Sequence, residues 1–93
     1  MPRVVRLLTI TGRVQGVWYR GWTVETATAL GLDGWVRNRR DGSVEALVAG
    51  EATAVDRFIQ ACHDGPPAAR VDGVSVKEAA DAPDPGFAQR ATV

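Results

Sequence analysis

The sequence predicts an α+β fold in which two helices cover one face of an antiparallel sheet. Two segments, residues 21–30 and residues 51–63, have helical periodicity. Short runs rich in β-branched residues precede, separate and follow these segments, and an Asp-Gly pair between two of the runs is typical of a hairpin turn. The predicted order is strand, helix, strand, strand, helix, strand (βαββαβ), which is the split β-α-β arrangement of ferredoxin-like folds. Right-handed crossovers put both helices on the same side of the sheet.

The chain begins with an apolar strand and a weakly amphipathic helix. Residues 4–10 are apolar on both faces apart from Arg6, which is typical of a central strand. The helix of residues 21–30 contains three threonines, which are poor helix formers, so its stability must come from packing. One of its faces has small or apolar residues at helical spacing: Thr23, Thr26, Ala27 and Leu30. Gly31 is placed to end this helix in a left-handed cap.

A hairpin and a stronger helix follow. Residues 34–38 and 43–49 are the predicted arms of the hairpin, and Asp41-Gly42 lies in its turn. The helix of residues 51–63 is the clearest in the sequence, because four apolar residues share one face: Val55, Phe58, Ile59 and Cys62. Gly65 and the two prolines after it end this helix.

The last third of the chain contains the fourth strand. Residues 71–78 have Val74 and Val76 on one face. Residues 87–93 are weakly patterned and predict only a short last strand. With 93 residues and no low-complexity linker, we expect residues 1–93 to form a single domain.

Composition and charge exclude several function classes. Eleven basic residues balance eleven acidic ones, so we expect neither nucleic acid nor a membrane as a partner. Cys62 is the only cysteine, so no intrachain disulfide forms, and the N-terminus lacks the features of a secretory signal. No run of 18 apolar residues occurs. We therefore expect a soluble, cytoplasmic protein that is a monomer.

The residues between the first strand and the first helix are suited to binding an anion. Residues 11–20 read TGRVQGVWYR, with Gly12 and Gly16 at the predicted bend. The first N–H groups of a helix have no partner within it, and together with the helix dipole they favour a bound anion. Arg20 adds a planar, permanently charged guanidinium. Neither a Walker A loop nor a dinucleotide fingerprint is present, and the alternative is a plain turn with a surface arginine.

Two motifs then point to one family. The segments GRVQGVWYR (12–20) and GWVRNRRDGSVE (34–45) together closely resemble the acylphosphatase family. LGLDGWVRN (30–38), the Gly65-Pro66 pair and the valine-rich fourth strand extend this resemblance over nearly the whole chain. The resemblance implies the ferredoxin-like fold that the periodicity also predicts. It implies an enzyme that hydrolyses the mixed anhydride of a carboxylic acid and phosphate, with inorganic phosphate as a product.

The resemblance also implies residue roles. Arg20 would bind the phosphoryl oxygens, and Asn38 would hold the attacking water. Backbone N–H groups of the loop would hold the phosphate, namely those of Gln15, Gly16, Val17, Trp18, Tyr19 and Arg20. The substrate would be a small-molecule acyl phosphate, and the family implies neither a metal nor an organic cofactor. An amide such as Asn38 is no general base at neutral pH, but its oxygen accepts a hydrogen bond from water and can orient it.

Several neighbouring residues have two interpretations. Trp18 and Trp22 flank Arg20 and would wall the site, exclude water or contact the acyl group. Arg37, Arg39 and Arg40 would steer anionic substrates, although a solvated strand edge is the preferred interpretation. A structural salt bridge is the alternative for Arg20, and a turn-opening role is the alternative for Asn38. Three residues are expected to be structural only: Asp41 in the turn, Cys62 in the core and His63 at a helix end.

Three hypotheses compete with a stand-alone acylphosphatase. The first is a non-catalytic phosphate-binding or regulatory module with the same fold. The second is an acylphosphatase-like domain of a larger maturation enzyme, which a chain of 93 residues disfavours. The third is an RNA-binding ferredoxin-like domain, which the balanced charge and the missing aromatic RNA-binding motif disfavour.

Overall fold

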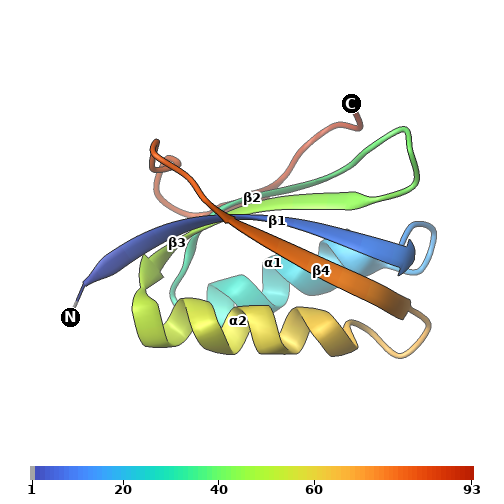
Figure 1. The fold of residues 1–93 in the computed structure, drawn as a ribbon, viewed down its shortest axis with the longest axis horizontal. Coiled ribbons are helices and arrows are strands. Elements are labelled where there is room, and N and C mark those ends of the chain that lie inside the picture. Colours follow the sequence, from blue (N-terminus) through green and yellow to red (C-terminus); the bar gives the residue numbers. More distant parts are fainter. Residues whose placement is uncertain (1) are drawn as a thin grey trace.

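The computed structural model describes residues 2–93, which form one mixed sheet with two helices packed on a single face (Figure 1). The sheet has the strand order β4-β1-β3-β2-β5. The elements in chain order are β1 (Arg3–Arg13), α1 (Tyr19–Ala29), β2 (Asp33–Asn38), β3 (Val44–Glu51), α2 (Ala52–Asp64), β4 (Arg70–Glu78) and β5 (Phe87–Gln89). The predicted ferredoxin-like α+β fold is confirmed, with one strand added to its sheet.

The added strand makes the sheet mixed rather than purely antiparallel. The pairs β1–β3, β1–β4 and β2–β3 are antiparallel, as predicted. The short strand β5 instead runs parallel to β2, with Phe87 opposite Gly34. The segment after it stays beside β2, because Arg90 donates its backbone N–H to the Val36 carbonyl at 2.8 Å. The C-terminal segment therefore lies along the edge of the sheet that leads to Asn38.

The core lies between the sheet and the two helices. Alternate residues of β3 face the helices, so Val44, Ala46 and Val48 are fully buried, as their alternation predicts. The helices contribute the residues that their periodicity selected, including Thr23, Ala27, Val55, Phe58 and Cys62, all with at most 1% of their surface exposed. Within residues 2–93, no helix covers the opposite face of the sheet (Figure 1). Side chains of one strand that point to opposite faces therefore have very different surroundings.

The strand β1 is longer than the sequence predicts, and this removes Gly12 from the anion loop. Gly12 pairs with Val71 of β4 at an irregularity in the register. A Cβ atom at this position would lie 2.2 Å from the carbonyl oxygen of Arg70, and the φ angle of Gly12 is 120°. The prediction that Gly12 lies at the bend of the anion loop is wrong. Glycine is required here because the edge strand β4 passes too close for a side chain.

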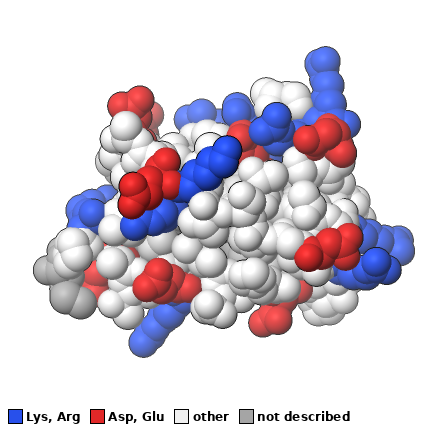
Figure 2. Space-filling model, viewed as in Figure 1, with Lys and Arg blue, Asp and Glu red and all other residues white. Residues whose placement is uncertain are grey.

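Both helices begin and end within two residues of their predicted limits. Gly31 has a φ angle of 70°, and the N–H of Leu32 donates to the Ala27 carbonyl at 3.0 Å. This is the predicted left-handed cap, and it directs the chain from α1 into β2. Neither helix in residues 2–93 is long and apolar enough to cross a membrane. Figure 2 shows basic and acidic side chains interspersed over the face in view.

Candidate active site

A small cavity lies where the β1–α1 loop, the first turn of α1 and the end of β2 meet. Its volume is about 120 Å³. It is lined by Val14, Gln15, Gly16, Trp18, Tyr19, Arg20, Gly21, Asn38 and Gln89. Arg20 lies in the first turn of α1 and Asn38 is the last residue of β2, and the fold brings them to the same cavity.

The backbone of the loop is held in a concave conformation. Gly16 and Trp18 have φ angles of 72° and 68°, and Trp18 is the only non-glycine residue with a positive φ in residues 2–93. Buried Val14 and Tyr19 fix the two ends of the loop in the core. Within the described part of the chain, no backbone N–H of residues 15–18 donates to another backbone group. Loops with left-handed residues and free N–H groups form concavities that bind anions.

The first turn of α1 adds further positive character to this cavity. The helix has no side-chain cap at its N-terminus and no acidic residue in its first turn. Its first N–H groups and the positive end of its dipole are therefore left for a ligand. Arg20 lies in this turn, is partly buried, and has no ion pair with any carboxylate of residues 2–93. An anion is the natural partner for this combination.

Asn38 brings a buried acceptor to the same cavity. It is the last residue of β2, and its side-chain oxygen Oδ1 is buried without a hydrogen-bond donor among the described residues. A buried acceptor without a partner costs about 1–3 kcal/mol, so such groups are rare unless a ligand uses them. The backbone carbonyl of Asn38 accepts the N–H of Val93 at 3.1 Å, which holds this end of β2 in place. The geometry suits an amide that binds and orients a small donor.

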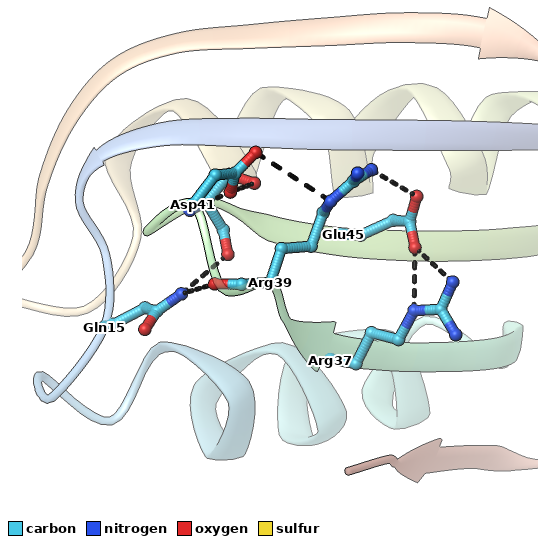
Figure 3. A network of polar contacts seen from close by, with 6 residues as sticks. Gln15, Arg37, Arg39, Asp41 and Glu45 are labelled. Carbon is cyan, nitrogen blue, oxygen red and sulfur yellow. Dashed lines mark hydrogen bonds and ion pairs between the residues drawn. The ribbon is translucent and has the colours of Figure 1, made fainter. Parts of the chain in front are cut away.

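The side chain of Gln15 ties the loop to the β2–β3 turn. Its Nε2 donates to the carbonyls of Arg39 at 2.7 Å and of Ser43 at 2.9 Å (Figure 3). Asp41 shapes that turn, because its Oδ1 accepts from both the N–H and the hydroxyl of Ser43. These hydrogen bonds fix the loop relative to the end of β2. The sequence predicts only the backbone of Gln15 as functional, and this structural use of its side chain is a further finding.

Tyr19 anchors the start of α1 to the end of α2. Its hydroxyl donates to the Cys62 carbonyl at 2.6 Å, and the ring is 1% exposed. A Cβ atom on Gly65 would lie 2.7 Å from this ring, so glycine there leaves room for it. Burial raises the pKa of Tyr19 and raises that of the Cys62 thiol to about 12. Cys62 is thus a neutral core residue, as the sequence predicts.

The arginines beside Asn38 belong to the other face of the sheet. Arg37 contacts Glu45 through two of its nitrogens, at 2.7 and 2.6 Å. Arg39 approaches the second oxygen of the same carboxylate at 3.2 Å (Figure 3). Glu45 is 6% exposed, so both guanidinium groups are held by one buried carboxylate of the sheet. This arrangement supports the structural interpretation of Arg37 and Arg39 over substrate steering.

The structure separates the predicted site residues into two groups. Arg20, Asn38, Gln15, Gly16, Trp18 and Tyr19 all line the cavity. Val17 does not line it, and its side chain packs against the core. Trp22 is not among the residues that line the cavity; it packs against the core, with its ring centroid 5.3 Å from that of Tyr19.

Gln89 lines the cavity, although the sequence analysis does not single it out. It reaches the site because β5 adds in parallel beside β2, with Gln89 opposite Val36. The weak pattern of residues 87–93 contains no local signal for this placement. Across residues 2–93, no three His, Cys, Asp or Glu side chains are grouped in a way that could hold a metal ion.

Comparison with known proteins yields consistent matches. The family model described as Acylphosphatase matches residues 6–89. An acylphosphatase from Rhodospirillum rubrum is 60% identical over 84 residues, which cover 90% of this chain and 92% of the relative. The structure of an acylphosphatase from Coxiella burnetii has a TM-score of 0.91 at 32% identity and covers 95% of this chain and 93% of that one. Full-length HypF, in its phosphate- and nucleotide-bound form, has a TM-score of 0.89 at 27% identity, and the match covers 98% of this chain but 12% of HypF.

Proposed function

Because the chain belongs to the acylphosphatase family and is a hydrolase acting on acyl phosphates, we propose that Arg20, Asn38 and the loop backbone carry out this hydrolysis without a metal ion. The observation that carries the proposal is the shared cavity. Arg20, Asn38 and the loop line the same space of about 120 Å³, and within residues 2–93 the Arg20 guanidinium has no ion pair, the N–H groups of residues 15–18 have no backbone acceptor and the Asn38 Oδ1 has no donor. Each of these three features suits one requirement of the reaction.

Arg20 and the backbone N–H groups of residues 15–20 bind the phosphoryl group. Phosphoryl transfer passes through a loose transition state whose charge is spread over three equatorial oxygens. Several fixed donors stabilise that charge without rearranging, which is the main way such reactions are accelerated. Arg20 has no competing carboxylate among residues 2–93, so its guanidinium is available to the substrate.

Asn38 holds the attacking water. Its Oδ1 accepts a hydrogen bond from the water and directs a lone pair of the water oxygen toward phosphorus. Because an amide does not take up the proton at neutral pH, the proton passes to an oxygen of the phosphoryl group itself. The leaving group is a stable carboxylate, so no protein acid is needed to protonate it.

The atoms and electrons of this step balance. The water oxygen forms a bond to phosphorus while the bond between phosphorus and the bridging oxygen breaks. The electron pair of the broken bond stays with the carboxylate. The products are the free carboxylate and inorganic phosphate, which now carries the oxygen of the water.

The test is the hydrolysis of benzoyl phosphate in excess EDTA. Wild type is compared with Arg20→Ala, Asn38→Ala and, as a matched control, Arg40→Ala, which removes an exposed arginine of the hairpin turn. Circular dichroism establishes that each variant is folded. We expect metal-independent turnover that falls about 10³–10⁵-fold without Arg20. Loss of Asn38 should lower kcat by about 10²–10³-fold, as for other transition-state donors and acceptors.

Other outcomes separate the alternatives. If the folded wild type does not turn over substrate in EDTA but binds phosphate, the non-catalytic module is the better description. If EDTA abolishes turnover and added metal restores it, the metal-free part of the proposal is wrong. If Asn38→Ala keeps full activity, another group positions the water.

A further inference from the structure

The cavity is small compared with the pockets that enclose larger ligands. Its volume of about 120 Å³ compares with about 30 Å³ for one water in the liquid. It therefore has room for a phosphoryl group and the attacking water. Pockets that enclose larger ligands have volumes of about 300–1,000 Å³. A bulky acyl group, such as a benzoyl group, therefore extends out of the cavity and lies against the residues at its mouth.

The indole of Trp18 is the large apolar surface at that mouth. Trp18 lines the cavity and is 61% exposed. The other large hydrophobic residues that are similarly exposed in residues 2–93, Val76 and Val93, do not line it. The indole lies over Gly21, because a Cβ atom at Gly21 would approach Trp18 Nε1 to 2.1 Å. A glycine in the first turn of α1 thus makes room for this ring beside Arg20.

The backbone of Trp18 is held in an unfavourable conformation that stability does not explain. Its φ and ψ angles are 68° and 21°, in the left-handed region that large residues avoid. The ring gains little from burial, since it is mostly exposed. The other two indoles have partners within the protein: Trp22 packs on Tyr19, and Trp35 lies beneath Arg37 and Arg90. Strain of this kind persists mainly at functional sites.

We propose that Trp18 determines acyl-group specificity by binding the acyl part of the substrate against the face of its indole, so that aromatic acyl phosphates are preferred over short aliphatic ones. The inference rests on the hydrolysis proposed above. Offset stacking of two aromatic rings contributes beyond simple burial, whereas an acetyl group offers little surface to stack. The Trp18 backbone serves the phosphate equally for every substrate, so only its side chain discriminates between acyl groups.

The experiment measures one ratio, the kcat/KM for benzoyl phosphate divided by that for acetyl phosphate. It is determined for wild type, Trp18→Phe, Trp18→Leu and Trp18→Ala. Effects on the common phosphate site cancel in this ratio. We expect it to fall about tenfold in Trp18→Ala, to fall less in Trp18→Leu, and to stay near wild type in Trp18→Phe, which keeps an aromatic ring. Trp35→Leu is the matched control, since it removes an indole that does not line the cavity.

A binding measurement gives a second, independent readout. Competitive inhibition by inorganic phosphate and by benzylphosphonate is compared in the same proteins. Loss of the Trp18 ring should weaken benzylphosphonate about tenfold more than phosphate, because only the first carries an aromatic group. This readout serves even for a variant whose turnover is too slow to measure.

The outcomes distinguish the inference from the function on which it rests. If wild type hydrolyses neither substrate, the proposed function fails and the inference fails with it. If both substrates are hydrolysed and the ratio is the same in wild type and Trp18→Ala, the inference alone is overturned. The inference is also overturned if all three Trp18 variants lose both activities equally, or if Trp35→Leu lowers the ratio as much as Trp18→Ala.

Discussion

Arg37 and Asn38 are neighbours in β2, yet only the side chain of Arg37 has polar partners among residues 2–93. Arg37 points to the open face of the sheet and contacts the Glu45 carboxylate through two nitrogens (Figure 3). Asn38 lies on the cavity side, where its Oδ1 is buried and receives no hydrogen bond from residues 2–93. The first side chain has its partner within the protein, and the second is available to a ligand.

The same contrast separates the two arginines. The guanidinium carbon of Arg37 also lies 4.5 Å from the ring centre of Trp35, so both the Glu45 carboxylate and this ring stabilise its charge. Arg20 has neither a carboxylate partner nor an aromatic ring among the contacts recorded for residues 2–93. Charge alone therefore does not identify the arginine that we propose binds the phosphoryl group. What distinguishes Arg20 is that the protein leaves its guanidinium unpaired beside backbone donors.

The largest expected effect is on activity, when lysine replaces each of these two arginines in turn. Lysine keeps the charge but loses the planar fork of donors, so Arg20→Lys should lower kcat/KM by about 10²-fold. Arg37→Lys should instead lower stability and leave kcat/KM close to wild type. Both quantities are measured on the same preparations, by benzoyl phosphate hydrolysis and by urea unfolding. Equal losses of activity in both variants would contradict the distinction between the two faces.

Removing the carboxylate of Glu45 tests the paired face directly. Glu45→Gln removes the buried negative charge that Arg37 and Arg39 share but keeps one acceptor oxygen, and we expect a loss of about 2 kcal/mol in the free energy of unfolding. The midpoint of urea unfolding reports this loss. Glu25→Gln is the control, because Glu25 is an exposed residue of α1. A stability unchanged by Glu45→Gln would mean that the ion pairs contribute nothing.

A smaller effect on stability is expected at Tyr19, which anchors the start of α1 beside the cavity. Tyr19→Phe removes the hydroxyl that donates to the buried Cys62 carbonyl at 2.6 Å. An unsatisfied buried carbonyl should lower the free energy of unfolding by about 1 kcal/mol, measured by urea unfolding. The kcat/KM should fall much less than in Arg20→Lys, because the ring still fills its place beside Gly65. A large loss of activity at unchanged stability would place the Tyr19 hydroxyl in the reaction instead.

The smallest effect concerns another paired residue of β2, Asp33. Its carboxylate accepts the N–H of Gly86 at 2.8 Å and contacts Arg3 at 3.1 Å. The hydrogen bond from Gly86, assisted by Arg3, holds the pKa of Asp33 below its ordinary value of 3.8, although partial burial opposes this. Asp33→Asn should therefore lower stability at neutral pH by less than about 1 kcal/mol.

The pH dependence of this difference has a definite sign. Because the folded pKa of Asp33 is lowered, its contribution is fully present above pH 3.8 and is lost as the pH falls through the folded value. Urea unfolding of wild type and Asp33→Asn should thus converge in acid. Parallel curves for Asp33→Asn would show that its charge is not involved.

The amino-acid sequence by itself determined most of the elements and one half of the site. The alternation of Val44, Ala46 and Val48 selected the buried face of β3, and Gly31 ended α1 as its position predicts. The loop and its arginine were also recognisable, since glycine, helix start and Arg20 are close in the chain. Such features depend on contacts between residues a few positions apart, so a local pattern is sufficient to predict them.

Only the tertiary structure decided which side chains face the cavity. It moved Gly12 into a strand, directed Trp22 into the core while Trp18 stayed exposed, and brought Gln89 to the site through a parallel strand. It also gave Arg37 and Arg39 the carboxylate of Glu45 and left the side-chain oxygen of Asn38 without a donor among residues 2–93. The physical reason is that partners distant in the chain compete for each polar group. Which groups remain for a substrate depends on that competition, and it is resolved only when the sheet and helices pack together.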